Sequence, residues 1–247
     1  LDQVTWMDVR IGEILPTPRH GKPVEINAYW YNALRILEHL APRMEESGEE
    51  YAALAEQVRE SFAREFWMEE KGALQDLVSG GPEDVQIRCN QIWAVSMPFS
   101  MLSAEQEKQV VHTVLRELYT PVGLRTLSPC DPSFHPTYGG EQEQRDLAYH
   151  QGTVWPFPLG AFYLSYLKVN NYTLRAVKQV REWLDALIPA LREGCAGQLP
   201  EIYDGENPTA SRGCFAQAWS VGEILRVYEA LEKINVRRNC SAPSIQR

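Results

Sequence analysis

The side chains best suited to chemistry in this sequence are carboxylates and aromatic rings, and both are concentrated in four long segments that also contain Gly and Pro. These segments are residues 1–23, 67–88, 119–152 and 194–212. Sugar rings stack their apolar faces on aromatic side chains, and their hydroxyl groups hydrogen-bond to carboxylates. Hydrolysis of a glycosidic bond needs two carboxyl groups, one protonated as the acid and one ionised as base or nucleophile. The segments are therefore compatible with carbohydrate chemistry, and equally with solvated acidic loops.

Motifs of several other chemistries are missing from the sequence. It contains no P-loop, no GxGxxG, no HExxH and no GxSxG pattern. The five His residues provide no closely spaced pair of metal ligands, and the five Cys residues include no CxxC. We therefore predict no metal and no cofactor. The odd number of scattered cysteines is unlike a disulfide framework, which favours a reducing, cytoplasmic location.

Charge and apolar patterning argue against two kinds of partner. Lys and Arg number 24 against 33 Asp and Glu, a formal net charge of −9. An acidic chain without a basic run is unsuited to nucleic acid or to an anionic membrane surface. The most apolar stretch, residues 154–169, contains two prolines and is shorter than the roughly 20 residues of a membrane helix. No signal peptide precedes the fold and the chain begins with Leu1, so we interpret it as a segment of a longer protein.

Apolar residues recur at helical spacing through most of the chain, and we predict seven helices. The first has the stripe Ile26, Tyr29, Trp30, Ala33, Leu37 and Leu40, and the second has Tyr51, Leu54, Ala55, Val58, Phe62 and Phe66. Another starts at Ser103, where Gln106 completes a capping box. The others are predicted over residues 90–101, 153–169, 171–192 and 213–233, the last with the stripe Ala218, Val221, Leu225 and Tyr228. Strand signals are weak.

These helices are separated alternately by short and long connections, which suggests stacked helical hairpins with the long loops at one end. We predict an all-α domain over residues 1–234, followed by a polar tail over residues 235–247. An α/α toroid is built in this way. A helical-repeat solenoid is the alternative, but the chain shows no fixed repeat length.

Five segments of the sequence together resemble a known family. They are TWMD (5–8), TPRHGKPVEINAYWYNAL (17–34), RTLSPCDPSFHPTYGG (125–140), RDLAYHQGTVWPF (145–157) and LPEIYDGENP with RGCFAQAWSVGEILR (199–226). In this order they resemble the glucosidase half of glycogen debranching enzymes, the amylo-α-1,6-glucosidase domain. The resemblance extends over nearly the whole chain, from about residue 1 to residue 232.

The resemblance implies an (α/α)6 toroid, of which about seven helices would be roughly the second half. It implies hydrolysis of the α-1,6-linked glucose at a trimmed branch point, with inversion, and a branched α-glucan such as glycogen or a limit dextrin as partner. The family's general acid maps on Asp8 and its general base on Glu201. We expect Trp6 and Met7 to shield the Asp8 carboxyl from water and so to favour its proton-donating form.

Other residues of the same segments are candidates for holding the sugar. They are Trp6, Arg19, Lys22, Glu25, Trp30, His150, Gln151, Trp155 and Asp204. Arg19 and Lys22 flank a turn and could bind hydroxyl groups, and Trp155 could form a wall. Structural roles compete at several positions: Glu25 is also a favourable charge at a helix N-terminus, and Trp30 could equally belong to the core.

Two further interpretations remain open at this point. The chain could be a half-toroid that binds carbohydrate without turning it over. It could also be a glucoamylase-like exo-α-glucosidase, because the preference for a linkage depends on loop shape. The presence of both motif carboxylates, Asp8 and Glu201, favours an enzyme.

Overall fold

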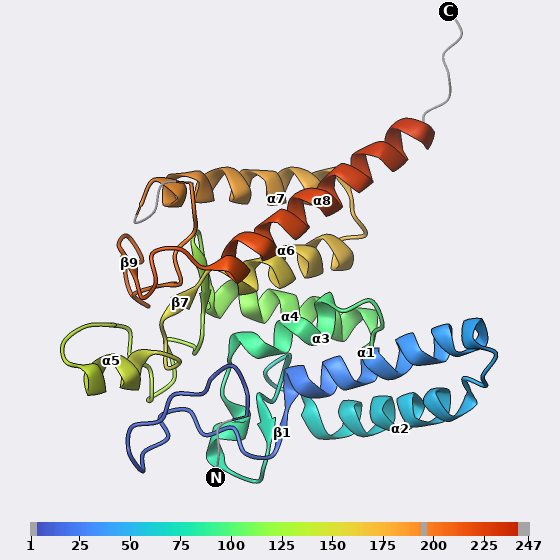
Figure 1. Cartoon of the computed structure of the whole chain (residues 1–247), viewed down its shortest axis with the longest axis horizontal. Coiled ribbons are helices and arrows are strands. Elements are labelled where there is room, and N and C mark those ends of the chain that lie inside the picture. The colour runs from blue at the N-terminus through green and yellow to red at the C-terminus, as the bar shows by residue number, and fades with distance from the viewer. Residues whose placement is uncertain (1–3, 194–196, 242–247) are drawn as a thin grey trace, which may run out of the picture.

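Helices form the framework of the computed structural model, which describes residues 4–193 and 197–241 (Figure 1). The α-helices are α1 (Val24–Leu40), α2 (Glu49–Phe66), α3 (Ile92–Ser96), α4 (Ala104–Glu117), α5 (Gln142–Ala148), α6 (Pro158–Val169), α7 (Leu174–Leu187) and α8 (Ala218–Ser241). Four short 3-10 helices accompany them: η1 (Ala41–Met44), η2 (Pro82–Val85), η3 (Cys89–Gln91) and η4 (Ile188–Arg192).

The long helices pack in two layers, and consecutive long helices of the chain alternate between the layers. In one layer α1 packs on α3, α3 on α6, and α6 on α8. In the other layer α2 packs on α1, α4 on α3 and α6, and α7 on α6. The central helix α6 is almost entirely buried. This stacked-hairpin arrangement confirms the predicted helical fold and is that of part of an (α/α)6 toroid.

Four of the predicted helices have different ends, and prolines account for three of them. The helix expected over residues 90–101 is only η3 and α3, because Pro98 forces Met97 into an extended conformation. Pro158 begins α6, so the residues before it are free to form a strand. At Pro189 the predicted sixth helix changes from α7 to η4. The seventh, α8, starts at Ala218 and continues to Ser241, so part of the predicted tail is helical and residues 242–247 lie outside the described residues.

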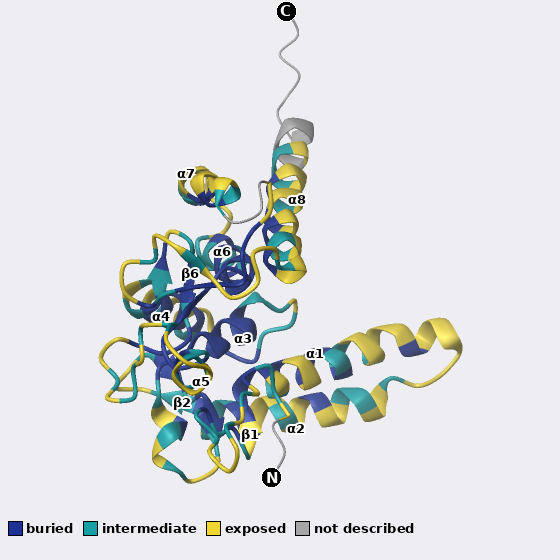
Figure 2. Cartoon of the chain, turned by 60° about the vertical axis from the view of Figure 1, so that its left-hand side comes forward, coloured by how far each residue is buried: buried dark blue, intermediate teal, exposed yellow. Residues whose placement is uncertain are grey.

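The predicted stripe of α2 is largely buried, and the capping box of Ser103 and Gln106 is present at the start of α4. The predicted apolar stripes of α1 and α8 lie on the exposed side of each helix and not in the core. On α1, Trp30 is 51% exposed and Leu37 42%; on α8, Leu225 is 60% exposed. These two helices end the layer formed by α1, α3, α6 and α8, so each buries the face that meets its neighbour and leaves its apolar stripe accessible (Figure 2).

Short strands occur in the long loops and were not predicted. Five of them form an antiparallel sheet in the order β5 (Tyr119–Thr120), β6 (Gly123–Arg125), β7 (Val154–Trp155), β8 (Ile202–Tyr203) and β9 (Ser211–Arg212). The strands β1 (Lys22–Pro23) and β4 (Leu77–Val78) pair the loop before α1 with the loop after α2. Within the latter loop, β2 (Trp67–Met68) pairs with β3 (Ala73–Leu74). The loops gather at one end of the helices, as predicted (Figure 1).

None of the helices in the described part of the chain is long and apolar enough to cross a membrane.

Candidate active site

The five-stranded sheet brings two of the motif segments together. Val154 in β7 pairs with Tyr203 in β8, and β8 pairs in turn with β9. Glu201 immediately precedes β8, so the sheet places it beside the segment that runs from Tyr149 to Trp155. Strands of two residues show no periodicity, which is why the sequence predicted the segments but not the pairing between them.

Glu201 is buried, with 8% of its surface exposed, and donors reach both of its carboxyl oxygens. The hydroxyl of Tyr149 donates to Oε1, and Gln217 Nε2 lies 3.5 Å from the same oxygen. The backbone N–H of Cys214 donates to Oε2 over 2.7 Å. A carboxylate is an acceptor only, so this set of donors suits an ionised carboxylate that is held in one orientation.

The groups around Glu201 respond to its charge. Burial raises the pKa of Tyr149 far above its ordinary value, and the hydrogen bond to Glu201 raises it further. The charge of Glu201 also raises the pKa of the Cys214 thiol. Both groups therefore keep their protons at neutral pH, and Tyr149 remains a donor to Glu201.

An aromatic cluster lies next to Tyr149. Trp6 packs edge to face on His150, Trp155 and Phe157, with ring centroids 5.0 to 5.3 Å apart. His150 stacks on Trp155 at 5.5 Å and contacts Tyr149 at 4.7 Å. The cluster thus connects Trp6, two residues before Asp8, with the tyrosine that contacts Glu201.

A cavity of about 380 Å³ opens beside this cluster, between α1 and α8. Its aromatic lining residues are Trp6, Tyr29, Trp93, Phe157 and Trp219, and Glu25 and Glu223 are its carboxylates. Burial raises the pKa of Tyr29, and the charges of Glu25 and Glu223 raise it further. The rings offer a sugar surfaces for stacking, and Glu223 offers a carboxylate for hydrogen bonding. Sequence reasoning selected only Trp6 and Glu25 of this set for the sugar.

Asp8 is exposed, which contradicts the expectation that its neighbours shield it. Met7 points into the core and is fully buried, and Trp6 packs into the aromatic cluster. The apolar side chains that precede Asp8 are therefore used for packing, and the carboxyl of Asp8 is left accessible to a ligand.

Arg19 and Glu25 form a buried ion cluster with Asp76. The guanidinium of Arg19 pairs with both carboxyl oxygens of Glu25, and its Nε donates to Asp76 Oδ2 over 2.7 Å. Burial alone would lower the pKa of Arg19, but the nearby carboxylates raise it above its ordinary value. Arg19 is 3% exposed and its donors are engaged inside the protein, which favours an internal role over direct binding of sugar hydroxyls.

Two other predicted sugar ligands also serve internal contacts. Gln151 accepts from Arg88 and donates to the backbone oxygen of Pro16 over 2.6 Å. Asp204 accepts from the backbone N–H of Tyr138 over 2.8 Å and pairs with Arg212 at 3.0 Å. Both residues tie loops together at the site.

The remaining predicted ligands differ in exposure. His150 and Trp155 are buried, and neither ring nitrogen of His150 has a hydrogen-bond partner among the described residues. Trp155 is buried inside the aromatic cluster, where it stacks on His150, and does not form the side of an open pocket. Lys22 is exposed in β1, and Trp30 is exposed on α1 and does not line the aromatic cavity.

Sequence reasoning did not select Tyr149, Asn90 or Asp76. Tyr149 directly precedes His150 in a motif segment, and this position was the one feature of the sequence that could have indicated a role at the site. Asn90 and Asp76 lie in segments that carried no motif, and only the fold reveals their contacts with Trp6 and Arg19.

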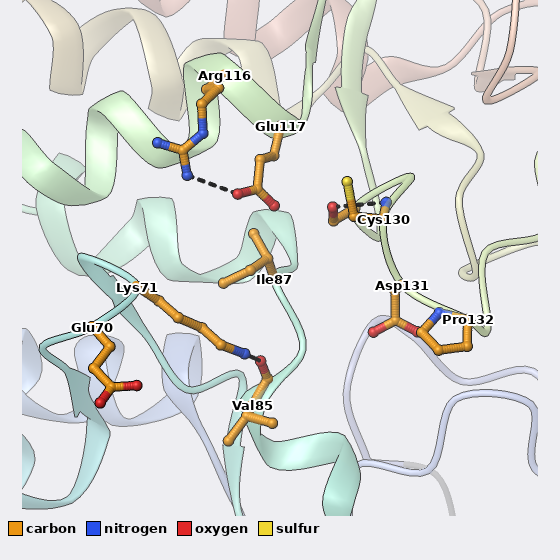
Figure 3. Close-up of a pocket in the computed structure, with 10 residues that line it drawn as sticks. Glu70, Lys71, Val85, Ile87, Arg116, Glu117, Cys130, Asp131 and Pro132 are labelled. Carbon is orange, nitrogen blue, oxygen red and sulfur yellow. Dashed lines mark hydrogen bonds and ion pairs between the residues drawn. The ribbon is translucent and has the colours of Figure 1, made fainter.

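A second hollow, of about 550 Å³, is lined mostly by polar and charged side chains, with Val85, Ile87 and Pro132 among them (Figure 3). Lys71 donates to the backbone oxygen of Val85, and Arg116 pairs with Glu117. Its lining contains no aromatic ring, so it offers no surface on which a sugar could stack. Within residues 4–193 and 197–241, no group of three or more His, Cys, Asp or Glu is arranged to hold a metal ion.

Solved structures of low sequence identity have a similar fold. A GH63 mannosylglycerate hydrolase from Thermus thermophilus, in complex with glucose, matches with a TM-score of 0.61 and 17% identity over 84% of this chain and 45% of that chain. Neutral trehalase Nth1 from Saccharomyces cerevisiae matches with a TM-score of 0.58 and 14% identity over 86% of this chain and 40% of that chain.

Sequence comparisons agree with this fold. A glycogen debranching enzyme of Saccharomyces cerevisiae is 25% identical in an alignment 288 positions long, which covers 91% of this chain and 18% of the relative. The chain therefore spans less than a fifth of that protein and less than half of the matched structures. Residues 1–226 match the family described as amylo-alpha-1,6-glucosidase. The match covers most of the chain and contains both motif carboxylates, and the chain belongs to this family of glycoside hydrolases.

Proposed function

We propose that the chain carries the catalytic carboxylates of a hydrolase that releases glucose from α-1,6 branch points of glycogen-like limit dextrins. The family assignment supports the substrate class, and the environment of Glu201 supports the chemistry. The observation that carries the proposal is a buried carboxylate held by donors at both oxygens, beside a cluster of aromatic rings.

In this proposal Asp8 is the general acid and Glu201 is the general base. Asp8 is accessible and can protonate the oxygen of the leaving sugar. Glu201, as an ionised carboxylate, takes the proton from the water that attacks the anomeric carbon from the opposite face, which inverts the configuration. The rings of the 380 Å³ cavity provide stacking surfaces for glucose units. No metal or cofactor takes part.

The buried polar residues have a supporting role. The cluster of Arg19, Glu25 and Asp76 and the contacts of Gln151 and Asp204 hold the loops that carry the two carboxylates. Catalysis by a carboxylate pair depends on such placement, since misplacement by about 1 Å can cost about 100-fold in rate.

The test is the release of glucose from a branched limit dextrin, with the anomer of the product followed by NMR. We expect β-glucose as the first product. Release of α-glucose would contradict inversion, and release only from linear α-1,4 chains would indicate a glucoamylase-like enzyme. Binding of the dextrin without any glucose would indicate a carbohydrate-binding half-toroid.

A further inference from the structure

The hydroxyl of Tyr149 lies against the carboxyl of Glu201, although 52 residues separate them in the chain. The contact joins the loop before β7 to the residue before β8, so it depends on the pairing of Val154 with Tyr203. Two other donors reach the carboxyl: the backbone N–H of Cys214 holds Oε2 over 2.7 Å, and Gln217 Nε2 lies at the longer distance of 3.5 Å from Oε1.

Tyr149 is itself held from several sides. Its ring contacts Tyr138 at 5.5 Å, His150 at 4.7 Å and Trp155 at 5.1 Å. Its backbone oxygen accepts from Thr153 Oγ1 over 2.5 Å and from the indole N–H of Trp155 over 3.2 Å. The hydroxyl therefore approaches Glu201 from a fixed position, and little conformational entropy remains to be lost when the contact forms.

The opposite side of the carboxyl is confined as well. Gly213 has a φ of +64°, and a Cβ atom at this position would collide with Glu201 Oε2. The backbone of residues 213 and 214 thus approaches the carboxyl more closely than a residue with a side chain would permit. Glu201 is clamped between this backbone and the hydroxyl of Tyr149.

We propose that Tyr149 is the positioning residue of the general base: its hydroxyl fixes the rotamer of Glu201 and stabilises the ionised carboxylate that accepts the proton of water. The inference rests on the proposed role of Glu201 and adds to it a residue that acts through Glu201 rather than on the sugar. Because Tyr149 keeps its proton at neutral pH, it supplies this hydrogen bond throughout the working range.

The test compares Tyr149→Phe with the matched control Tyr203→Phe. The first change removes the hydroxyl at Glu201 and keeps the ring. The second removes a buried hydroxyl two residues from Glu201 that lies near Glu193 instead. Both variants are measured for glucose release from a limit dextrin over a range of pH, and for thermal unfolding.

For Tyr149→Phe we expect kcat/KM to fall about 10- to 100-fold, the usual value of a hydrogen bond to a charged group. We also expect the acidic limb of the pH profile to move up by about one unit, because the carboxylate loses a stabilising donor and accepts a proton more readily. Tyr203→Phe should keep the wild-type limb. A purely structural tyrosine would lower the unfolding temperature and leave the limb in place.

A fluorinated tyrosine at position 149 provides a second measurement that does not depend on the folding of the Phe variant. Fluorine makes the hydroxyl a stronger donor, so the acidic limb should move to lower pH. An unchanged limb in both variants overturns the proposal. Glu201→Gln separates the base role of Glu201 from the positioning role of Tyr149. If this variant keeps full activity, Glu201 is not the base and both proposals fail. If Glu201→Gln is inactive and Tyr149→Phe is unchanged, the role of Tyr149 alone is overturned.

Discussion

The indole N–H of Trp6 donates to the side-chain oxygen of Asn90 over 2.8 Å, across 84 residues of the chain. The amide nitrogen of Asn90 donates to Asp76 Oδ1 over 2.8 Å and lies 3.5 Å from the sulfur of Met7. One buried amide therefore contacts the two residues that immediately precede Asp8. Because Asp8 itself is exposed, the contacts of Asn90 with Trp6 and Met7 position the proposed acid.

We expect Asn90→Ala to lower the free energy of unfolding by about 1–3 kcal/mol, because it leaves the indole N–H of Trp6 without its acceptor and removes one donor from the buried carboxyl of Asp76. Activity should fall further than stability alone explains, since the segment that carries Asp8 loses its anchor. Urea unfolding and dextrin hydrolysis measure the two effects.

A double-mutant cycle with Trp6→Phe isolates the contact between these two residues. The ring of Phe retains part of the packing but cannot donate to Asn90. The summed losses of the two single variants should exceed the loss of the double variant, as is usual for groups in contact. Strictly additive losses would mean that Trp6 and Asn90 stabilise the segment independently.

Arg19 is expected to matter for stability rather than for sugar binding. Arg19→Met removes the cation from a cluster in which Glu25 and Asp76 are 2–3% exposed. Glu25 loses its charge partner, and Asp76 is left with Arg88 at the longer distance of 3.9 Å. Removal of one partner from a buried ion pair typically costs about 3–5 kcal/mol. Chemical denaturation should show this loss.

The exposed ion pair of Arg59 and Glu56 provides the comparison, and Arg59→Ala should leave the unfolding curve where it is. A substrate-binding role for Arg19 makes a different prediction. If Arg19→Met raised KM for the dextrin while the unfolding curve stayed in place, the guanidinium would contact the sugar and our assignment of Arg19 to the protein interior would be wrong.

The sequence predicted the helices better than their faces. Periodicity located α1 and α8, but it could not tell which side of each helix meets a neighbour, because both helices end a layer and have apolar residues on more than one face. The resemblance to the family indicated Glu201, whereas its contact with Tyr149 depends on strands of two residues that leave no pattern. Arg19 was selected as a ligand because it flanks a turn, and nothing in the sequence pairs it with Asp76, which is 57 residues away.

His150 should make stability depend on pH. Burial lowers its pKa to about 3, and the charges of Arg88 and Arg19 contribute. Between about pH 6.5 and pH 3 the unfolded chain binds a proton here that the folded protein does not, so the stabilisation is present above pH 6.5 and is lost as the pH falls. The loss between pH 7 and pH 5 should be about 2 kcal/mol.

His150→Phe tests this assignment. Phe keeps a ring against Trp155, and neither ring nitrogen of His150 has a hydrogen-bond partner to lose among the described residues. Urea unfolding at pH 7 and at pH 5 should show a smaller difference in the variant than in the wild type. The exposed His39 on α1 serves as the comparison, and His39→Gln should keep the wild-type difference. An equal difference in all three proteins would place the sensitive group elsewhere.

The two proposed catalytic carboxylates should respond differently to the leaving group. Asp8→Asn keeps the size of the side chain but removes the proton that it donates, and Glu201→Gln removes the base that activates water. Acid and base catalysis each contribute typically 10²–10⁴-fold to rate, so both variants should lose about this much on a branched dextrin. Fluoride leaves with little help from an acid. On a glucosyl fluoride, Asp8→Asn should therefore retain much of its activity, while Glu201→Gln stays slow because water must still lose a proton.

Thermal unfolding accompanies these assays, since a variant that is less stable would lose activity on both substrates alike. Asp8 is exposed and lies outside the core, so Asp8→Asn should keep the wild-type unfolding temperature. Glu201 is buried, but Gln retains an oxygen for the hydroxyl of Tyr149 or the N–H of Cys214, and the loss of stability should be small beside the loss of rate.

If Asp8→Asn lost equal activity on both substrates, Asp8 would not be the acid. If Glu201→Gln hydrolysed the dextrin at the wild-type rate, the base would have to be sought among Glu25, Asp204 and Glu206.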